Sequence, residues 1–224
     1  MNNDIISINK DWVAIEDYQF KILILTSVLA EKSLAYRGTL SNMCEWLGIA
    51  NVPKNTKQIK QAIKELQDKE YIFYHEEGRT HHISITNKGL KDKRIVKVKR
   101  KWIDTIKDFN IAKNGNVNRS WDIMTKALIT ILWEIQEQQK ITTITDGVVI
   151  TMKQLGAEID RCETTTGTII NKLTECNFDD VQKSSWYYKY VANAVNKGIV
   201  FGKSENLFRK NGKGNEKNAF LCCG

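Results

Sequence analysis

Four lysines without a nearby acid are the residues best placed to bind a charged ligand. They are Lys54, Lys57, Lys60 and Lys64, and no acidic residue follows until Glu65. Surface helices more often place a glutamate four residues before a lysine, because that pair is stabilising. Ammonium groups without such partners can bind a polyanion, and the ordinary alternative is a solvated helix face. The missing counter-charge favours contact with DNA over a solvated face.

A second basic segment extends from Lys88 to Lys101 and holds eight lysines and arginines against one acid, Asp92. Two interpretations are open. The segment can be a flexible basic linker. It can also be a strand or helix packed on one side, because Ile95, Val96 and Val98 alternate with basic residues. In that case its charges would lie along the phosphates of a nucleic acid between the two domains and position its backbone without reading its sequence.

The whole chain has the same sign of charge as these two segments. It has 224 residues, a formal net charge of +8 and an isoelectric point near 9.1. Such a charge favours polyanionic partners, although basicity alone is weak evidence. The length suits one large domain or two domains of about 100 residues, and we favour two.

A helix must position the first lysine cluster. Pro53, the only proline, marks the turn before it, and Asn55 can cap the helix with Gln58 three residues later. A buried stripe of apolar residues at spacing 0, 3, 4, 7 follows at Ile59, Ala62, Ile63 and Leu66. Lys57, Gln61 and Lys64 then face away from the core, with Lys60 at the flank.

The neighbouring segments supply the rest of a small domain. Residues 17–33 have the apolar spacing of a core helix. A two-turn helix is expected in 39–49, with Ser41 as its N-cap and Gly48 at its C-terminal end. Residues 71–85 form two β-rich runs joined at Gly78, which predicts a hairpin.

This order of helix, short helix, polar-faced helix and hairpin resembles the winged helix-turn-helix superfamily over residues 16–86. The resemblance implies that the third helix enters the DNA major groove and that the hairpin touches the DNA backbone or the minor groove. It makes Lys57, Gln58, Lys60, Gln61 and Lys64 groove and phosphate candidates, with Arg79 as the hairpin contact. The turn "IANVPK" is longer than most members of the superfamily have.

A second copy of the pattern follows. Residues 120–139 predict a long amphipathic helix, 151–159 a short one with a capping box at Thr151 and Gln154, and 160–175 a third. The third helix repeats the 0, 3, 4, 7 stripe from Thr166 to Leu173. Its outward residues are short polar groups instead of mostly lysines, namely Thr164, Thr165, Thr168, Asn171 and Lys172.

The second copy also departs from the first. Residues 184–198 predict an extra helix, and 207–221 a hairpin with Asn211-Gly212 as its turn. Arg209, Lys210, Lys213 and Lys217 would make this hairpin basic. Contact of this second half with DNA is a weaker expectation than its fold.

The predicted fold class is α+β, mainly α, with two winged helix-turn-helix domains in tandem joined by a basic linker. The domains are expected at 1–90 and 119–224, the second with the extra helix, and the linker at 91–118. The predicted DNA-binding residues are Lys54, Asn55, Lys57, Gln58, Lys60, Gln61, Lys64, Arg79, Arg94, Lys97, Lys99, Arg100, Lys101, Thr164, Thr165, Thr168, Asn171, Lys172, Arg209, Lys210 and Lys213.

The sequence predicts no enzyme. "GKS" at Gly202 to Ser204 lacks the first glycine of a phosphate-binding loop, because Lys197 stands in that position. His75, His81 and His82 are expected on one hairpin, where the two adjacent histidines would point to opposite faces. We therefore expect no metal and no cofactor.

A cytoplasmic location is expected. The five cysteines, an odd set, lack C-x-x-C spacing, which argues against disulfides and a zinc site. The first residues lack the basic and apolar regions of a secretory signal. The longest apolar run, Ile22 to Ala30, is far shorter than the ~20 residues that span a membrane. We expect no membrane contact.

The leading hypothesis is a double-stranded-DNA-binding protein of a mobile element. Tandem winged helices in a small lysine-rich chain resemble plasmid or phage replication initiators and mobile-element transcription regulators, and the sequence does not separate these roles. Further partners under this hypothesis are a second copy of the chain and replication or transcription proteins. The alternative is a non-enzymatic interaction module or inhibitor that uses the same fold to bind a protein.

Overall fold

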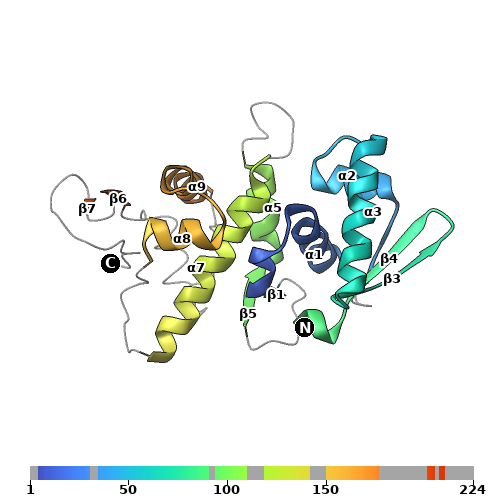
Figure 1. Cartoon of the computed structure of the whole chain (residues 1–224), viewed down its shortest axis with the longest axis horizontal. Helices are drawn as coiled ribbons and strands as arrows, with labels where there is room; N and C mark the ends of the chain where they lie inside the picture. Colours follow the sequence, from blue (N-terminus) through green and yellow to red (C-terminus); the bar gives the residue numbers. More distant parts are fainter. Residues whose placement is uncertain are drawn as a thin grey trace. The chain divides into compact units, whose positions relative to one another are not determined.

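The structure is a computed structural model that describes residues 5–30, 35–90, 94–109, 119–141, 150–176, 201–204 and 207–209. The described residues form a mainly helical α+β protein with small antiparallel sheets (Figure 1). Two compact units divide the chain, unit 1 at Met1–Asp122 and unit 2 at Ile123–Gly224. The predicted boundaries at residues 90 and 119 stay a prediction.

Helix α1 (Asp17–Leu29) is the central element of unit 1. It contacts β1, β2 and β4 as well as α2 and α3. Phe20 and the run Ile22–Leu25 are fully buried, so the helix is apolar around most of its circumference. Such a helix is stable only when neighbours cover it on several sides. The predicted core helix is confirmed.

Helix α2 (Leu40–Leu47) has well-defined ends. Thr39 is its N-cap and forms a capping box with Asn42, so the prediction of Ser41 as the cap was wrong by two residues. Thr39 has the extended backbone that an N-cap needs. Gly48 ends the helix with a φ of 69°, the left-handed conformation predicted for it.

Helix α3 (Pro53–Asp68) begins earlier than predicted. Val52 is the N-cap, and Pro53 occupies the first turn of the helix. Proline suits the first turn because its fixed φ is already close to the helical value. The prediction of Asn55 as the cap was wrong: its side-chain amide donates to the carbonyl of Ala50 at 2.7 Å. The predicted stripe is confirmed, since Ile59, Ala62, Ile63 and Leu66 are all buried.

A three-stranded antiparallel sheet completes this part of unit 1. Its strands are β2 (Ala35–Gly38), β3 (Ile72–Glu77) and β4 (Thr80–Ile85), in the order β2, β4, β3. The predicted hairpin of β3 and β4 is confirmed, with a φ of 60° at Gly78 in its turn. Its base lies at the C-terminal end of α3 (Figure 1). Strand β2 was not predicted.

The second basic segment is part of the folded structure of unit 1. Strand β5 (Ile95–Lys99) pairs antiparallel with β1 (Ile5–Asn9), and α5 (Arg100–Asp108) follows. The 3₁₀ helix η1 (Lys10–Ala14) follows β1 and the short helix α4 (Asn87–Leu90) precedes β5. A hydrogen bond from Trp12 Nε1 to the Gly89 carbonyl at 3.2 Å joins the two. The interpretation as a packed strand or helix is confirmed for residues 95–108.

Unit 2 holds most of α7 (Trp121–Ile141), then α8 (Met152–Glu158) and α9 (Glu163–Glu175). The predicted capping box at Thr151 and Gln154 is confirmed. Thr166, Ile169, Ile170 and Leu173 are buried, so the predicted stripe of α9 is confirmed too.

Two short strands follow in unit 2. β6 (Phe201–Ser204) pairs antiparallel with β7 (Leu207–Arg209), a pairing that was not predicted. The predicted extra helix at 184–198 and the turn at Asn211-Gly212 lie outside the described residues.

Candidate functional site

The lysines of α3 form an exposed basic face, which we call the α3 surface and define as Lys54, Lys57, Lys60 and Lys64. All four are solvent-exposed, opposite the buried stripe of the same helix. None of them has an acid within ion-pair distance among the described residues. The helix therefore presents four ammonium groups to a ligand.

The nearest acid on α3 is occupied by amides. The Glu65 carboxylate accepts hydrogen bonds from Gln61 at 2.6 Å and from Gln19 at 2.5 Å. The Gln61 bond is the main reason that the pKa of Glu65 lies below its ordinary value. Since Gln61 donates to Glu65, this predicted site residue is committed to the protein's own structure. Asn55 is likewise bound to the Ala50 carbonyl, and Gln58 is exposed.

A pocket of about 450 Å³ lies where α3 faces the hairpin turn and the start of α2. We call it the hairpin pocket. Two of its side chains, Lys60 and Arg79, are cations, and Glu76 is an acid. The pocket brings together Lys60 of the α3 surface and Arg79, both predicted as site residues. Its polar lining residues are Thr39, Ser41, Asn51, Thr56, Lys60, Glu76, Arg79 and His81.

His81 is the buried polar group of this pocket, with 2% of its surface exposed. Its Nδ1 lies 2.8 Å from the hydroxyl of Tyr74. Burial lowers the pKa of His81, against a smaller opposing effect of Glu76. This direction favours the neutral imidazole, and the cationic side chains of the pocket are Lys60 and Arg79. This arrangement suits an anionic ligand with hydroxyl groups.

The predicted residues around β5 are mostly engaged within unit 1. Arg94 is paired with Asp11 at 2.6 Å, and Lys97 donates to the Ser7 hydroxyl at 2.6 Å. Arg100 donates to the carbonyl of Ala30 at 3.4 Å. Lys99 is half-buried and Lys101 is exposed. This group is therefore less available to a ligand than the α3 surface.

The predicted residues of unit 2 lie on the outward face of α9. Thr164, Thr165, Thr168 and Asn171 are exposed there, with Lys172 half-buried. The Thr168 hydroxyl donates back to the Thr164 carbonyl at 3.1 Å. Arg209 ends β7, and the predicted Lys210 and Lys213 lie outside the described residues.

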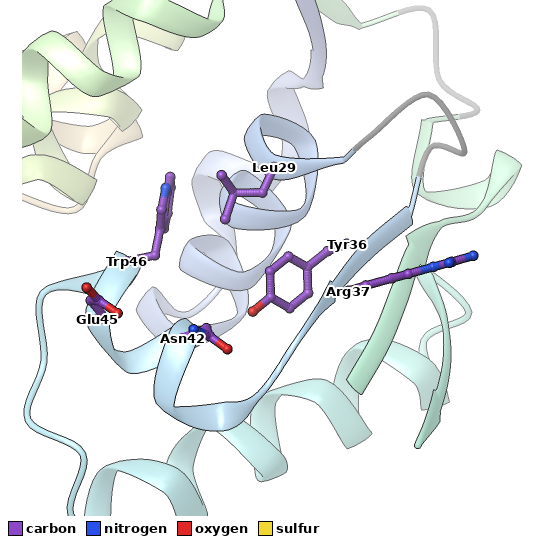
Figure 2. Close-up of a pocket in the computed structure, with 6 residues that line it drawn as sticks. All are labelled: Leu29, Tyr36, Arg37, Asn42, Glu45 and Trp46. Carbon is purple, nitrogen blue, oxygen red and sulfur yellow. The ribbon is translucent and has the colours of Figure 1, made fainter. Parts of the chain in front are cut away.

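Sequence reasoning missed a second pocket of unit 1, of about 490 Å³, which we call the α2 pocket (Figure 2). It is missed because β2, which supplies Tyr36, was not predicted. The sequence carries one weak signal for the α2 pocket. Tyr36 stands two residues before Gly38, shortly before the predicted helix that carries Trp46. Its lining residues are Leu29, Tyr36, Arg37, Asn42, Glu45 and Trp46.

The described part of the chain shows no group of three or more His, Cys, Asp or Glu residues that could hold a metal ion. Among the same residues, no helix is both long and apolar enough to span a bilayer.

Comparison with known proteins gives one match. A model of the S-layer homology domain family matches residues 177–209. Only β6 and β7 of this region belong to the described residues. No curated protein matches the chain.

This match corrects several predictions. It points to the cell surface, so the predicted winged helix-turn-helix DNA-binding family and the cytoplasmic location were wrong. The predicted partner, double-stranded DNA, and the predicted roles in replication initiation or transcription regulation were wrong for the same reason. The physical source of the error is that a lysine-rich helix identifies a polyanionic ligand but not which polyanion.

Proposed function

We propose that the chain is a non-enzymatic binding protein of the cell envelope that holds an anionic wall polymer. The observation that carries this proposal is the match of residues 177–209 to the S-layer homology domain. Domains of that family bind cell-wall polysaccharides. A basic chain of net charge +8 has the sign of charge that an acidic polysaccharide attracts.

The α3 surface supports the ionic part of this proposal. Its four lysines are exposed and lie on one helix, so successive acidic groups of an extended polymer can each meet an ammonium group. The hairpin pocket adds Arg79 and two threonine hydroxyls beside Lys60. Lys60 and Arg79 can donate hydrogen bonds to the hydroxyl-rich backbone of a polysaccharide. The two threonine hydroxyls already donate within the protein and can accept from it.

We also propose that the chain has two winged-helix-like domains in tandem. This part of the proposal concerns the fold alone and implies no DNA binding. Its support in unit 1 is the order α1, β2, α2, α3, β3, β4. Its support in unit 2 is the series α7, α8, α9, in which α8 has the same kind of capping box as α2.

Sedimentation with cell walls tests the proposal. The purified chain is mixed with wall fragments of an S-layer-bearing bacterium, either intact or stripped of polysaccharide with hydrofluoric acid. We expect the protein to pellet with intact walls and to stay in solution with stripped walls. Pelleting should fall as salt rises, because the contacts are ionic. Equal pelleting with both preparations would show that the polysaccharide is not the ligand.

A matched pair of variants separates the α3 surface from bulk basicity. Lys57→Gln/Lys60→Gln/Lys64→Gln removes three charges from α3, and Lys97→Gln/Lys99→Gln/Lys101→Gln removes three from β5 and α5. We expect the first variant to lose most of its wall binding and the second to keep it. An equal loss in both would mean that net charge, and not the α3 surface, holds the polymer.

A second candidate function is binding to a protein partner, favoured by the exposure of Phe73. This side chain is 62% exposed on β3, and its ring lies 6.1 Å from that of His75. A large exposed aromatic group is a common anchor of protein interfaces. Capture of isolated S-layer protein by the wild-type chain, and its loss in Phe73→Ser, would support this role. Equal capture by both would exclude Phe73 as the anchor.

A further inference from the structure

The α2 pocket has the composition of a site for a small polar ligand. Strand β2 alternates its side chains, so Tyr36 faces the inside of unit 1 while Arg37 projects from the other side of the strand (Figure 2). Helix α2 supplies Asn42, Glu45 and Trp46. The volume of about 490 Å³ lies within the usual range of small-molecule sites.

The hydroxyl of Tyr36 is a buried donor without a partner. Tyr36 is 4% exposed, and its Oη has no hydrogen-bond partner among the described residues. Figure 2 shows this hydroxyl directed toward α2. Burial raises the pKa of Tyr36 to about 12, so the group keeps its proton. An unpaired buried hydroxyl is costly, and a ligand acceptor would remove that cost.

Asn42 and Glu45 complete the polar set with opposite roles. The Asn42 Oδ1 accepts from the backbone nitrogen of Thr39 at 3.1 Å and from its hydroxyl at 2.6 Å. These two bonds fix the amide, so its NH₂ group is the part that can donate to a ligand. The Glu45 carboxylate is exposed and can only accept.

Leu29 and Trp46 give the pocket an apolar wall. The Trp46 ring is held in place by Lys107, whose Nζ lies 3.4 Å from the ring centroid. Trp121 packs edge-on against the same ring, with centroids 5.4 Å apart. A wall fixed in this way loses little freedom when a ligand binds.

We propose that the α2 pocket binds an N-acetylated sugar through its acetamido group. The acetamido carbonyl accepts from Tyr36 and Asn42, its N–H donates to Glu45, and its methyl group lies against Leu29 and Trp46. A plain hexose offers hydroxyls but neither this carbonyl nor the methyl group. The inference rests on the proposed function for the source of the sugar, and the pocket shares no residue with the α3 surface.

Calorimetric titration of the full chain with N-acetylglucosamine tests the site. We expect saturable binding of N-acetylglucosamine and binding of glucose that is at least about tenfold weaker, since glucose offers no carbonyl to the buried Tyr36 hydroxyl and no methyl group to the apolar wall. N-acetyl-lysine carries the same acetamido group without a sugar ring and should also bind more weakly. Equal binding of N-acetyl-lysine would overturn the assignment to a sugar.

Three variants locate the binding in the pocket. Tyr36→Phe removes the donor and should weaken binding about fivefold, as expected for one hydrogen bond. Gly38→Ala places a Cβ 2.2 Å from the Tyr36 hydroxyl, which must move, so binding should also fall. Tyr18→Phe, a half-buried tyrosine outside the pocket, is the matched control and should bind like wild type.

The outcomes separate this inference from the proposed function. Absence of N-acetylglucosamine binding, or equal binding by wild type and Tyr36→Phe, would overturn the sugar site even if the chain pellets with walls. The opposite result is also informative. If the chain binds the sugar through Tyr36 but does not pellet with walls, the proposed function is refuted and the pocket assignment stands.

Discussion

The buried ammonium group of Lys107 should make the stability of unit 1 rise with pH. Lys107 is 7% exposed, with its Nζ over the Trp46 ring. Burial lowers the pKa of Lys107 from 10.5 to about 8, and Asp104 and Asp108 oppose this in part. In the unfolded chain the pKa returns to the ordinary value. Between pH 8 and 10.5 the unfolded chain thus holds a proton that the folded protein has released.

The sign and size of the effect follow from that difference. Stability rises with pH wherever the unfolded state binds more protons. Each unit of pKa difference corresponds to about 1.4 kcal/mol, so the shift from 10.5 to about 8 gives at most about 3 kcal/mol. The attraction between the ammonium group and the indole face, up to about 2 kcal/mol when desolvated, opposes the shift. We expect a rise of about 1 to 3 kcal/mol, complete near pH 10.5.

Urea unfolding of wild type and Lys107→Met, at several pH values from 7 to 10.5, measures this contribution. Methionine fills a similar volume without a titrating group. The difference in the free energy of unfolding between the two proteins should change in favour of wild type as pH rises. Tyrosine and cysteine ionisation affects both proteins equally and cancels in the difference. NMR titration of the Lys107 side chain gives its pKa directly.

Two results would refute the reasoning. The first is a difference between wild type and Lys107→Met that stays constant over this pH range. The second is a Lys107 pKa at or above the ordinary value for lysine, which would mean that the contact with Trp46 and the nearby acids outweighs burial.

Four further substitutions test the packing of unit 1 by chemical denaturation. Leu66→Ala, at a fully buried position, should cost about 2 to 5 kcal/mol; a cost below 1 would show that α3 packs loosely. Thr39→Ala removes the cap of α2 and should cost about 1 kcal/mol, and no loss would mean the capping box is not formed. Gly48→Ala, at a φ of 69°, should cost about 1 kcal/mol, whereas a gain would contradict the left-handed backbone. Tyr36→Phe should leave stability unchanged or raise it by up to about 1 kcal/mol, and a large loss would reveal a partner for the hydroxyl.

Some features of the fold could be read from local patterns. The stripe of α3, the capping box of α8 and the turn at Gly78 each depend on residues close together in the sequence. The exact cap of α2 was missed because Thr39 and Ser41 have similar capping chemistry, and the backbone geometry decides between them.

The candidate site was only partly predictable for the same reason. The α3 lysines and Arg79 were found as separate charges, while their meeting at the hairpin pocket depends on how the hairpin folds beside α3. The α2 pocket depends on β2, a short strand that pairs with β4 far along the chain. Short strands with non-local partners carry little pattern of their own.

The sequence by itself determined where the apolar stripes and the unbalanced lysines lie, because helical periodicity and charge are local properties. From these patterns the sequence predicted two winged-helix domains and double-stranded DNA as the ligand, and the DNA ligand was wrong. Only the tertiary structure decided which charges stay available: Arg94 and Lys97 are engaged by Asp11 and Ser7 across the β1–β5 pair, while the α3 lysines are not. It also buried the Tyr36 hydroxyl without a hydrogen-bond partner in the part of the chain that the structure describes. Both outcomes depend on contacts between residues distant in the chain, which spacing in the sequence does not encode.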